Sequence, residues 1–224
     1  MQAAPTTEQL LAIHGRIRQC TACRLHETRT QAVPGYGPVT ARVMAVGEAP
    51  GEKEDLQGRP FVGAAGQLLT ELMESIGLSR RDIYITNTVR CRPPGNRDPE
   101  PDEVAACSHF LDEQIELMRP DVILVLGRHA LQRLLPEMGG ISRLHGQRID
   151  RDGRVYVPLF HPAAALYNGS LRQTLFDDMR RVREYLDEAE ALRAGTDLEV
   201  RGRGQPHDMV AEHVEADQLT LFAP

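Results

Sequence analysis

The chain has 224 residues, of which 41% are hydrophobic, and a formal net charge of −6. No apolar run approaches the length of a membrane span, and the first residues, MQAAPTTEQLL, lack the basic and apolar regions of a secretion signal, so we expect a cytoplasmic protein. The negative charge is local, because residues 187–224 hold nine acidic and three basic side chains (3 − 9 = −6), which leaves residues 1–186 neutral. Nucleic acid is therefore not excluded as a partner.

Helical and strand patterns alternate along residues 1–186. Apolar residues recur at helical spacing over 6–18, 63–78, about 101–118, 127–135 and 170–186. Short apolar runs, typical of buried strands, occupy 43–47, 82–89, 121–127 and 155–160, whereas 28–41, 93–101 and 139–154 are polar or rich in Gly and Pro. This alternation predicts an α/β protein, a three-layer αβα sandwich with a central four-stranded parallel sheet.

The pattern fades after the last predicted helix. Residues 187–224 are charged and poor in apolar side chains, which predicts a disordered acidic tail. The tail ends in a short apolar cluster, QLTLF, at 218–222. We therefore predict one folded domain over 1–186, followed by the tail over 187–224.

Four cysteines form the most specific single pattern. Cys20 and Cys23 are spaced C-x2-C, and Cys91 and Cys107 are spaced C-x15-C. Four thiolates suit zinc or an iron–sulfur cluster. Two disulfides, or scattered core cysteines, are the alternatives, but a reducing compartment and the close C-x2-C pair favour a shared metal site. The spacing does not distinguish zinc from iron.

Polar or glycine-rich residues follow every predicted strand. Glu48, Ala49, Glu54 and Asp55 come after the first strand, and Asn87, Gly127 and His161 end or follow the others. Each has an ordinary interpretation as a turn or a cap. Because the carboxyl ends of parallel strands share one edge of a sheet, we expect these side chains to converge there, where ligands of such folds bind.

Several common enzyme motifs are absent. Gly58 and Gly63 have the spacing of a phosphate-binding loop, but Ala64 and Ala65 stand where Lys and Ser or Thr belong. The sequence contains no G-x-G-x-x-G and no G-x-S-x-G. Nucleotide hydrolysis, dinucleotide binding and serine hydrolase chemistry are therefore disfavoured.

Four segments together resemble a known family. The segments 47–55, 58–69, 84–99 and 161–166, with the four cysteines, resemble family 4 uracil-DNA glycosylases, the iron–sulfur members of that superfamily. The resemblance covers about residues 10–186. It implies a DNA repair enzyme that hydrolyses the N-glycosidic bond of uracil, leaves an abasic site and so initiates base excision repair. It also implies a 4Fe–4S cluster on Cys20, Cys23, Cys91 and Cys107, and a monomer.

The resemblance also implies roles for residues that bind the substrate. Phe61 stacks on the flipped uracil, Asn87 reads its edge with an amide, and Leu166 fills the gap left in the duplex. Ala49 belongs to the substrate site, where relatives that trap the product covalently tend to have Gln. Those relatives also carry a Lys-Arg-Arg-Ile-His insert that this chain lacks after Asn87, so we expect no covalent intermediate.

For catalysis, the resemblance points to His161, Glu48 and Glu54. His161 donates a hydrogen bond to uracil O2 as negative charge develops on the leaving base. Glu48 and Glu54 orient the attacking water or stabilise the sugar cation, and the sequence does not divide these roles. Paired carboxylates also suggest sugar hydrolases, but the cysteines and the base-reading amide disfavour that class. A metal-stabilised nucleic-acid-binding module without catalysis is the alternative function.

Two further expectations concern DNA and a protein partner. The three arginines of segment 90–97 are expected along DNA phosphates, near a cluster of structural or DNA-contacting role. The tail residues Gln218, Leu219, Leu221 and Phe222 match the Gln-Leu-x-Leu-Phe peptide with which bacterial repair proteins bind the DNA sliding clamp. The alternative is that this apolar cluster folds back onto the core as a cap.

Overall fold

The computed structural model describes the backbone of residues 4–202 and the side chains of 4–192. The chain divides into two units, Met1–Ala189 and Glu190–Pro224. The clamp-binding peptide predicted at 218–222 lies outside the described residues.

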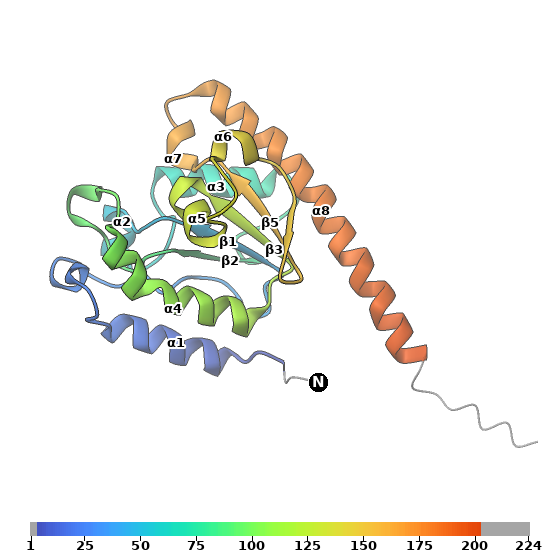
Figure 1. Cartoon of the computed structure of the whole chain (residues 1–224), viewed down its shortest axis with the longest axis horizontal. Helices are drawn as coiled ribbons and strands as arrows, with labels where there is room; N and C mark the ends of the chain where they lie inside the picture. The colour runs from blue at the N-terminus through green and yellow to red at the C-terminus, as the bar shows by residue number, and fades with distance from the viewer. Residues whose placement is uncertain (1–3, 203–224) are drawn as a thin grey trace, which may run out of the picture. The chain divides into compact units, whose positions relative to one another are not determined.

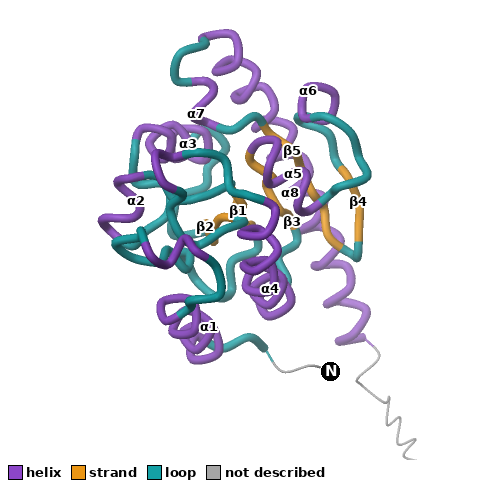
Figure 2. Tube along the Cα trace, turned by 60° about the vertical axis from the view of Figure 1, so that its left-hand side comes forward, coloured by secondary structure: helices purple, strands orange, loops and turns teal. Residues whose placement is uncertain are grey.

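A five-stranded sheet forms the centre of the first unit. Its order is β2-β1-β3-β5-β4, as Figure 2 shows. The first four of these strands are parallel to one another, and β4 is antiparallel to β5. The strands are β1 (Val43–Gly47), β2 (Ile83–Asn87), β3 (Val122–Leu126), β4 (Ile149–Arg151) and β5 (Arg154–Leu159). The predicted α/β class and parallel core are confirmed, with one more strand than predicted.

The additional strand arises from a tight hairpin. Asp152 and Gly153 have φ angles of 51° and 72°, which a two-residue turn between antiparallel strands requires. β4 spans Ile149–Arg151 and is largely exposed at the sheet edge. So short and polar an edge strand has no apolar alternation, which is why the sequence suggested a loop there.

Helices cover both faces of the sheet, giving the predicted three layers (Figure 1). Alternate strand residues enter two separate apolar cores: Val43 and Ala45 face one, and Met44 and Val46 face the other. The first core is closed by α3 (Ala64–Glu74), α7 (Pro162–Ala165) and α8 (Gly169–Gly202), and the second by α4 (Pro101–Met118) and α5 (Gly127–Leu134). The first helix, α1 (Thr7–Gln19), packs beside α4.

The long helices begin where their sequences provide caps. Thr6 and Gln9 form a reciprocal capping box at the start of α1. Glu100 and Glu103 do the same for α4, with Pro101 at its first position. Buried β strands and capped helices therefore lie within a few residues of their predicted places.

The last helix extends further than predicted. α8 spans Gly169–Gly202, whereas the sequence suggested an end near Leu186 and a disordered segment from 187. Residues 187–202 contain no Pro and are rich in Ala, Glu, Leu and Arg, which have high helix propensity, and this propensity was overlooked beside their high charge. No helix in the described range is long and apolar enough to cross a membrane.

Several short elements were not predicted. They are η1 (Arg24–Glu27), α2 (Glu52–Gln57), η2 (Pro94–Asn96), α6 (Ile141–Leu144) and α7 (Pro162–Ala165). Helices of one or two turns show no apolar periodicity. Three of them, α2, η2 and α7, nevertheless position residues of the cavity described next.

Candidate functional site

A cavity of about 390 Å³ lies at the carboxyl ends of the parallel strands. The structure brings together there six of the predicted site residues, and Leu166 and the cysteines lie elsewhere. The lining residues are Glu48, Ala49, Pro50, Gly51, Glu54, Phe61, Ala65, Asn87, Pro93, Asn96, Arg97, Asp98, His161 and Ala163.

Asn87 ends β2 and presents an unpaired acceptor at the cavity. Its side chain is buried, and its Oδ1 has no hydrogen-bond partner among the described residues. A Cβ on Gly47, the last residue of β1, would lie 2.6 Å from Asn87 Oδ1 and 2.6 Å from the Phe61 ring, so glycine there leaves room for both. Because an unpaired buried acceptor costs free energy, this oxygen is suited to accept a hydrogen bond from a bound ligand.

The loop that carries Phe61 is strained and tightly held. Phe61 has a φ of 53°, in the left-handed region that a bulky residue rarely adopts. Glu54 Oε1 accepts hydrogen bonds from the backbone N–H groups of Val62 and Gly63, both at 2.8 Å. Arg80 donates to the Phe61 carbonyl at 3.0 Å and to the preceding carbonyl at 2.9 Å. These bonds fix an aromatic ring in the cavity wall.

His161 caps the N-terminus of α7 beside that ring. Its imidazole stacks on Phe61, with centroids 5.7 Å apart and planes 29° apart. Its Nδ1 accepts from the Ala163 backbone N–H at 3.2 Å, and since a backbone N–H only donates, the proton of the neutral ring lies on Nε2. Burial lowers the pKa of His161 to about 4, with Glu54 opposing the shift. His161 is thus a neutral donor near pH 7.

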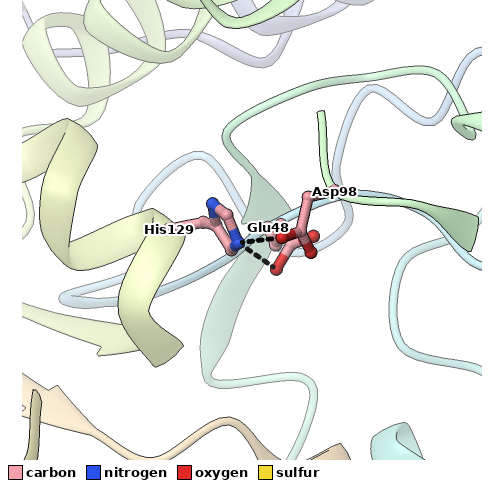
Figure 3. Close-up of side chains that lie close together, drawn as sticks. All are labelled: Glu48, Asp98 and His129. Atoms are coloured by element: carbon pink, nitrogen blue, oxygen red, sulfur yellow. Dashed lines mark ion pairs between the residues drawn. The ribbon is translucent and has the colours of Figure 1, made fainter. Parts of the chain in front are cut away.

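Glu48 lies in a charged cluster that Figure 3 shows with Asp98 and His129. His129 Nε2 is 3.6 Å from Glu48 Oε2 and 3.3 Å from Asp98 Oδ2. Arg128 contacts Asp98 at 2.5 Å. Burial raises the pKa of Glu48 and the Asp98 charge adds to this, whereas His129 and Arg128 oppose the rise. The carboxylate therefore lies in a partly dry, charge-rich position.

The same cluster does not fit a metal ion. Glu48, Asp98 and His129 each place one possible ligand atom within 4.8 Å of the others. However, Arg128 Nε lies 3.0 Å from His129 Nε2, and the Arg128 guanidinium pairs with Asp98. A guanidinium already occupies the position of a counter-charge, so a second cation there is disfavoured by repulsion. Asp98 and His129 were not predicted from the sequence, although His129 closely follows the strand-ending Gly127.

Leu166 lies outside the cavity, at the end of α7. It is 36% exposed, and the adjacent Tyr167 is 96% exposed. Since α7 begins at His161 in the cavity wall, this short helix presents two apolar side chains near the cavity. Tyr167 was missed from the sequence, although its place beside Leu166 was a signal.

A second, smaller cavity of about 10 Å³ is lined by all four cysteines. Cys20 and Cys23 follow α1, Cys91 follows β2, and Cys107 lies on α4. All four are free thiols, so the disulfide alternative is wrong. Burial raises the pKa of the Cys107 thiol to about 11, and Arg29 donates to Cys91 Sγ at 3.0 Å. Four soft donors around one space, with cationic side chains beside them, fit a metal centre.

Arg90 contradicts the expectation that the arginines of 90–97 lie along phosphates. Its side chain is only 1% exposed and makes its hydrogen bonds inside the protein, to Thr86, Gln114 and the Asn87 carbonyl. The sequence did not reveal this, because arginine is nearly always exposed unless it is paired.

The sequence profile of the Uracil DNA glycosylase superfamily matches residues 34–186 of this chain. The chain is 47% identical to the type-4 uracil-DNA glycosylase of Saccharolobus solfataricus, over 80% of this chain and 87% of that one. It is 46% identical to the type-4 enzyme of Sulfurisphaera tokodaii, over 79% of this chain and 84% of that one. It is 47% identical to the type-4 enzyme of Archaeoglobus fulgidus, over 79% of this chain and 93% of that one.

Proposed function

The chain belongs to the uracil DNA glycosylase superfamily and excises uracil from DNA in repair, and we propose that the cavity at the strand ends is where it does so. The observation that carries this assignment is the buried, unpaired Oδ1 of Asn87 in the cavity wall. The reaction is hydrolysis of the bond between uracil N1 and the sugar, which leaves an abasic site.

Asn87 selects uracil over cytosine in this proposal. Its Oδ1 accepts the N3–H of uracil, and its amide donates to O4. Cytosine has an acceptor at N3 and an amino donor at position 4, the reverse of uracil, so it would leave the buried amide unpaired. Phe61, held by Glu54 and Arg80, stacks on the flipped base, which contributes about 1–3 kcal/mol toward the few kcal/mol that flipping costs. Ala49 forms the adjacent wall, where its small side chain leaves room for the base.

His161 stabilises the departing uracil. Its Nε2–H is the only N–H donor of the neutral ring, because Nδ1 is an acceptor. A donor aimed at uracil O2 stabilises negative charge that grows as the glycosidic bond breaks. The low pKa of His161, about 4, keeps the donor neutral, so it does not repel the cationic sugar.

The two glutamates have different surroundings, which supports different roles. Glu54 uses Oε1 to hold the backbone of the Phe61 loop, so we assign it to positioning that ring. Among the described residues, no backbone N–H donates to the Glu48 carboxylate, which faces Asp98 and His129. We assign Glu48 to orienting the attacking water. Leu166, with Tyr167 beside it, occupies the gap that the flipped nucleotide leaves in the duplex.

Cys20, Cys23, Cys91 and Cys107 are proposed to hold a 4Fe–4S cluster. When bound, the cluster supplies a structural crosslink between α1, the end of β2 and α4, since this hydrolysis transfers no electrons. The enzyme is further proposed to be monofunctional, monomeric and cytoplasmic. The reducing cytoplasm would keep the four cysteines as the free thiols that a metal centre requires.

The test is excision from a uracil-containing oligonucleotide, followed by alkali to cleave the abasic site. The protein should be prepared in a host without its own uracil glycosylases. We expect cleavage at uracil and none at cytosine, and we expect Asn87→Ala, prepared identically, to be nearly inactive. Binding of DNA without excision would favour the nucleic-acid-binding module instead.

The tail carries a separate proposal, that Gln218, Leu219, Leu221 and Phe222 bind the bacterial sliding clamp. These residues lie outside the described residues, and the support is their sequence alone. A peptide of residues 215–224 should bind the clamp, and Leu221→Ala with Phe222→Ala should abolish binding without changing uracil excision. If the wild-type peptide does not bind, or the double variant loses thermal stability, the cap interpretation is favoured.

A further inference from the structure

Arg90 is a fully buried cation without an anionic partner. It follows β2 and is 1% exposed, and no salt bridge joins it to a carboxylate among the described side chains. Its acceptors are the Thr86 hydroxyl, the Asn87 carbonyl and the Gln114 amide oxygen, the last at 2.7 Å. All three are neutral. Removing a charge from water costs several kcal/mol unless an opposite charge compensates.

The guanidinium also has an unused donor. Nη1 and Nη2 donate to the three neutral acceptors, but Nε has no partner within the described part of the chain. A buried, unpaired N–H on a cation that forms no salt bridge with a described carboxylate indicates that a partner is missing from its surroundings.

The space beside Arg90 is the cysteine cavity. Arg90 lines that cavity together with the four cysteines. A cluster held by four thiolates is an anion, and its potential depends on net charge and on hydrogen bonds to sulfur.

The same guanidinium also contacts the end of β2, where Asn87 is proposed to bind the base. Nη1 donates to the Asn87 carbonyl and to the Thr86 hydroxyl, which precedes Asn87 on β2. Through Gln114, which donates to the Tyr84 hydroxyl at 2.8 Å, Arg90 is also tied to α4 and to the middle of β2. One side chain therefore contacts the linings of both cavities.

We propose that Arg90 is the internal counter-charge of the cluster and a positioning residue for Asn87, so that the metal centre and the base-reading amide are coupled through one guanidinium. This rests on the proposed cofactor. It predicts that the charge of Arg90 sets the midpoint potential of the cluster. The planar guanidinium, with its several donors, sets the position of Asn87.

Three variants separate these two roles. Arg90→Gln removes the charge, and Arg90→Lys keeps the charge but lacks the planar guanidinium with its several donors. Thr86→Val removes one neutral acceptor while keeping the shape of that side chain. The readouts are iron content, the midpoint potential of the cluster, and the single-turnover rate of excision from uracil-containing DNA.

We expect Arg90→Gln to shift the midpoint potential to more negative values and to lower iron retention, because reduction adds negative charge that a nearby cation stabilises. Arg90→Lys should keep the wild-type potential yet excise uracil about 10–100-fold more slowly, the usual scale for losing a supporting contact. Thr86→Val should leave the potential unchanged.

The outcomes are distinguishable. Wild-type protein with zinc in place of iron would overturn both the cofactor and this inference. Iron in the wild type, with an unchanged potential in Arg90→Gln, would overturn the inference alone. If Arg90→Gln does not fold, Arg90→Lys decides: a potential shifted away from wild type, or a wild-type excision rate, would show that Arg90 is only part of a structural hydrogen-bond network.

Discussion

The two cavities of this enzyme differ in almost every physical property. The strand-end cavity measures about 390 Å³ and is lined by polar groups, whereas the cysteine cavity measures about 10 Å³. Apolar residues from α1, η1 and α4 surround the cysteines: Ile13, Ile17, Leu25 and Phe110. The first cavity has space and an unpaired acceptor, and the second has thiols and an apolar shell. This contrast supports the roles proposed above, chemistry in the first cavity and a structural metal centre in the second.

The cavities are nonetheless adjacent along β2. Asn87 ends the strand in one cavity and Cys91 follows in the other. Arg97 lines the strand-end cavity and also donates to Glu103 at 2.7 Å, and Arg24, which follows Cys23, donates to Glu103 at 2.9 Å. The segment between Cys91 and Cys107 therefore also forms part of the wall of the strand-end cavity. Substitutions should show how far stability and chemistry can be separated.

The largest effect is expected in the cysteine cavity. Cys91→Ser should lose the cluster, melt at a much lower temperature and lose excision, because metal binding free energy is coupled to folding. Iron content and thermal unfolding measure this. Glu137→Gln, a change on the exposed surface away from both cavities, is the control. A folded, iron-free Cys91→Ser enzyme with wild-type excision would show that the cysteine cavity is not needed to stabilise the fold.

Next in size is the loss of the donor in the strand-end cavity. His161→Ala should lower the single-turnover excision rate by about 10²–10³-fold, the scale for removing a donor to a developing anion. Its iron content should stay at the wild-type level, and its melting temperature should fall only modestly, because the side chain also caps α7. His145→Gln is the matched control, since that imidazole bonds Asp178 at 2.8 Å away from the cavity and should affect stability rather than rate. A wild-type excision rate in His161→Ala, with a slower rate in His145→Gln, would contradict the assignment of His161 as the donor.

A pH profile should distinguish Glu48 from His161. Glu48 has a raised pKa, so its water-orienting carboxylate is lost at a pH above the ordinary glutamate value as pH falls. His161 has a pKa of about 4 and stays neutral through that range. Single-turnover rates between about pH 5 and 8 should therefore decline on the acid side, and Glu48→Gln should be slower and lack that decline. A decline that survives in Glu48→Gln would assign the titration to another group.

Stability should follow a different pH dependence. His14 and His161 both have pKa values lowered to about 4 by burial, below the ordinary 6.5. Between these values the unfolded chain binds more protons than the folded one, so their contribution is present above pH 6.5 and is lost as pH falls through about 4. Thermal unfolding across the same buffers tests whether the rate is lost before the fold.

The smallest effect is expected at the end of α7, where Leu166 is proposed to enter the duplex. Leu166→Ala should slow excision from duplex DNA about 10–100-fold, since burying a leucine contributes about 1.5–3 kcal/mol and ~1.4 kcal/mol corresponds to tenfold. Excision from single-stranded DNA should change little, because no gap in a duplex has to be filled. Leu11→Ala, at another exposed leucine, is the control. An equal loss on both substrates would place Leu166 in the base site instead.

The sequence by itself determined the parallel sheet and the meeting of Glu48, Asn87 and His161. Alternating apolar strands and helices force parallel strands, and parallel strands bring their carboxyl ends to one edge whatever the side chains are. The C-x2-C and C-x15-C spacing likewise identified the four cysteines that line one cavity. These inferences succeed because they depend on chain order and periodicity.

Only the tertiary structure decided what each of these residues contacts. That Glu54 holds a backbone loop while Glu48 faces His129, and that Arg90 is buried between two cavities, depends on segments far apart in the chain. The short strand β4 and the helix α7 also became visible only through their partners. Burial and hydrogen-bond partners set the charge, the pKa and the orientation of a side chain, and these are properties of its surroundings rather than of its place in the sequence.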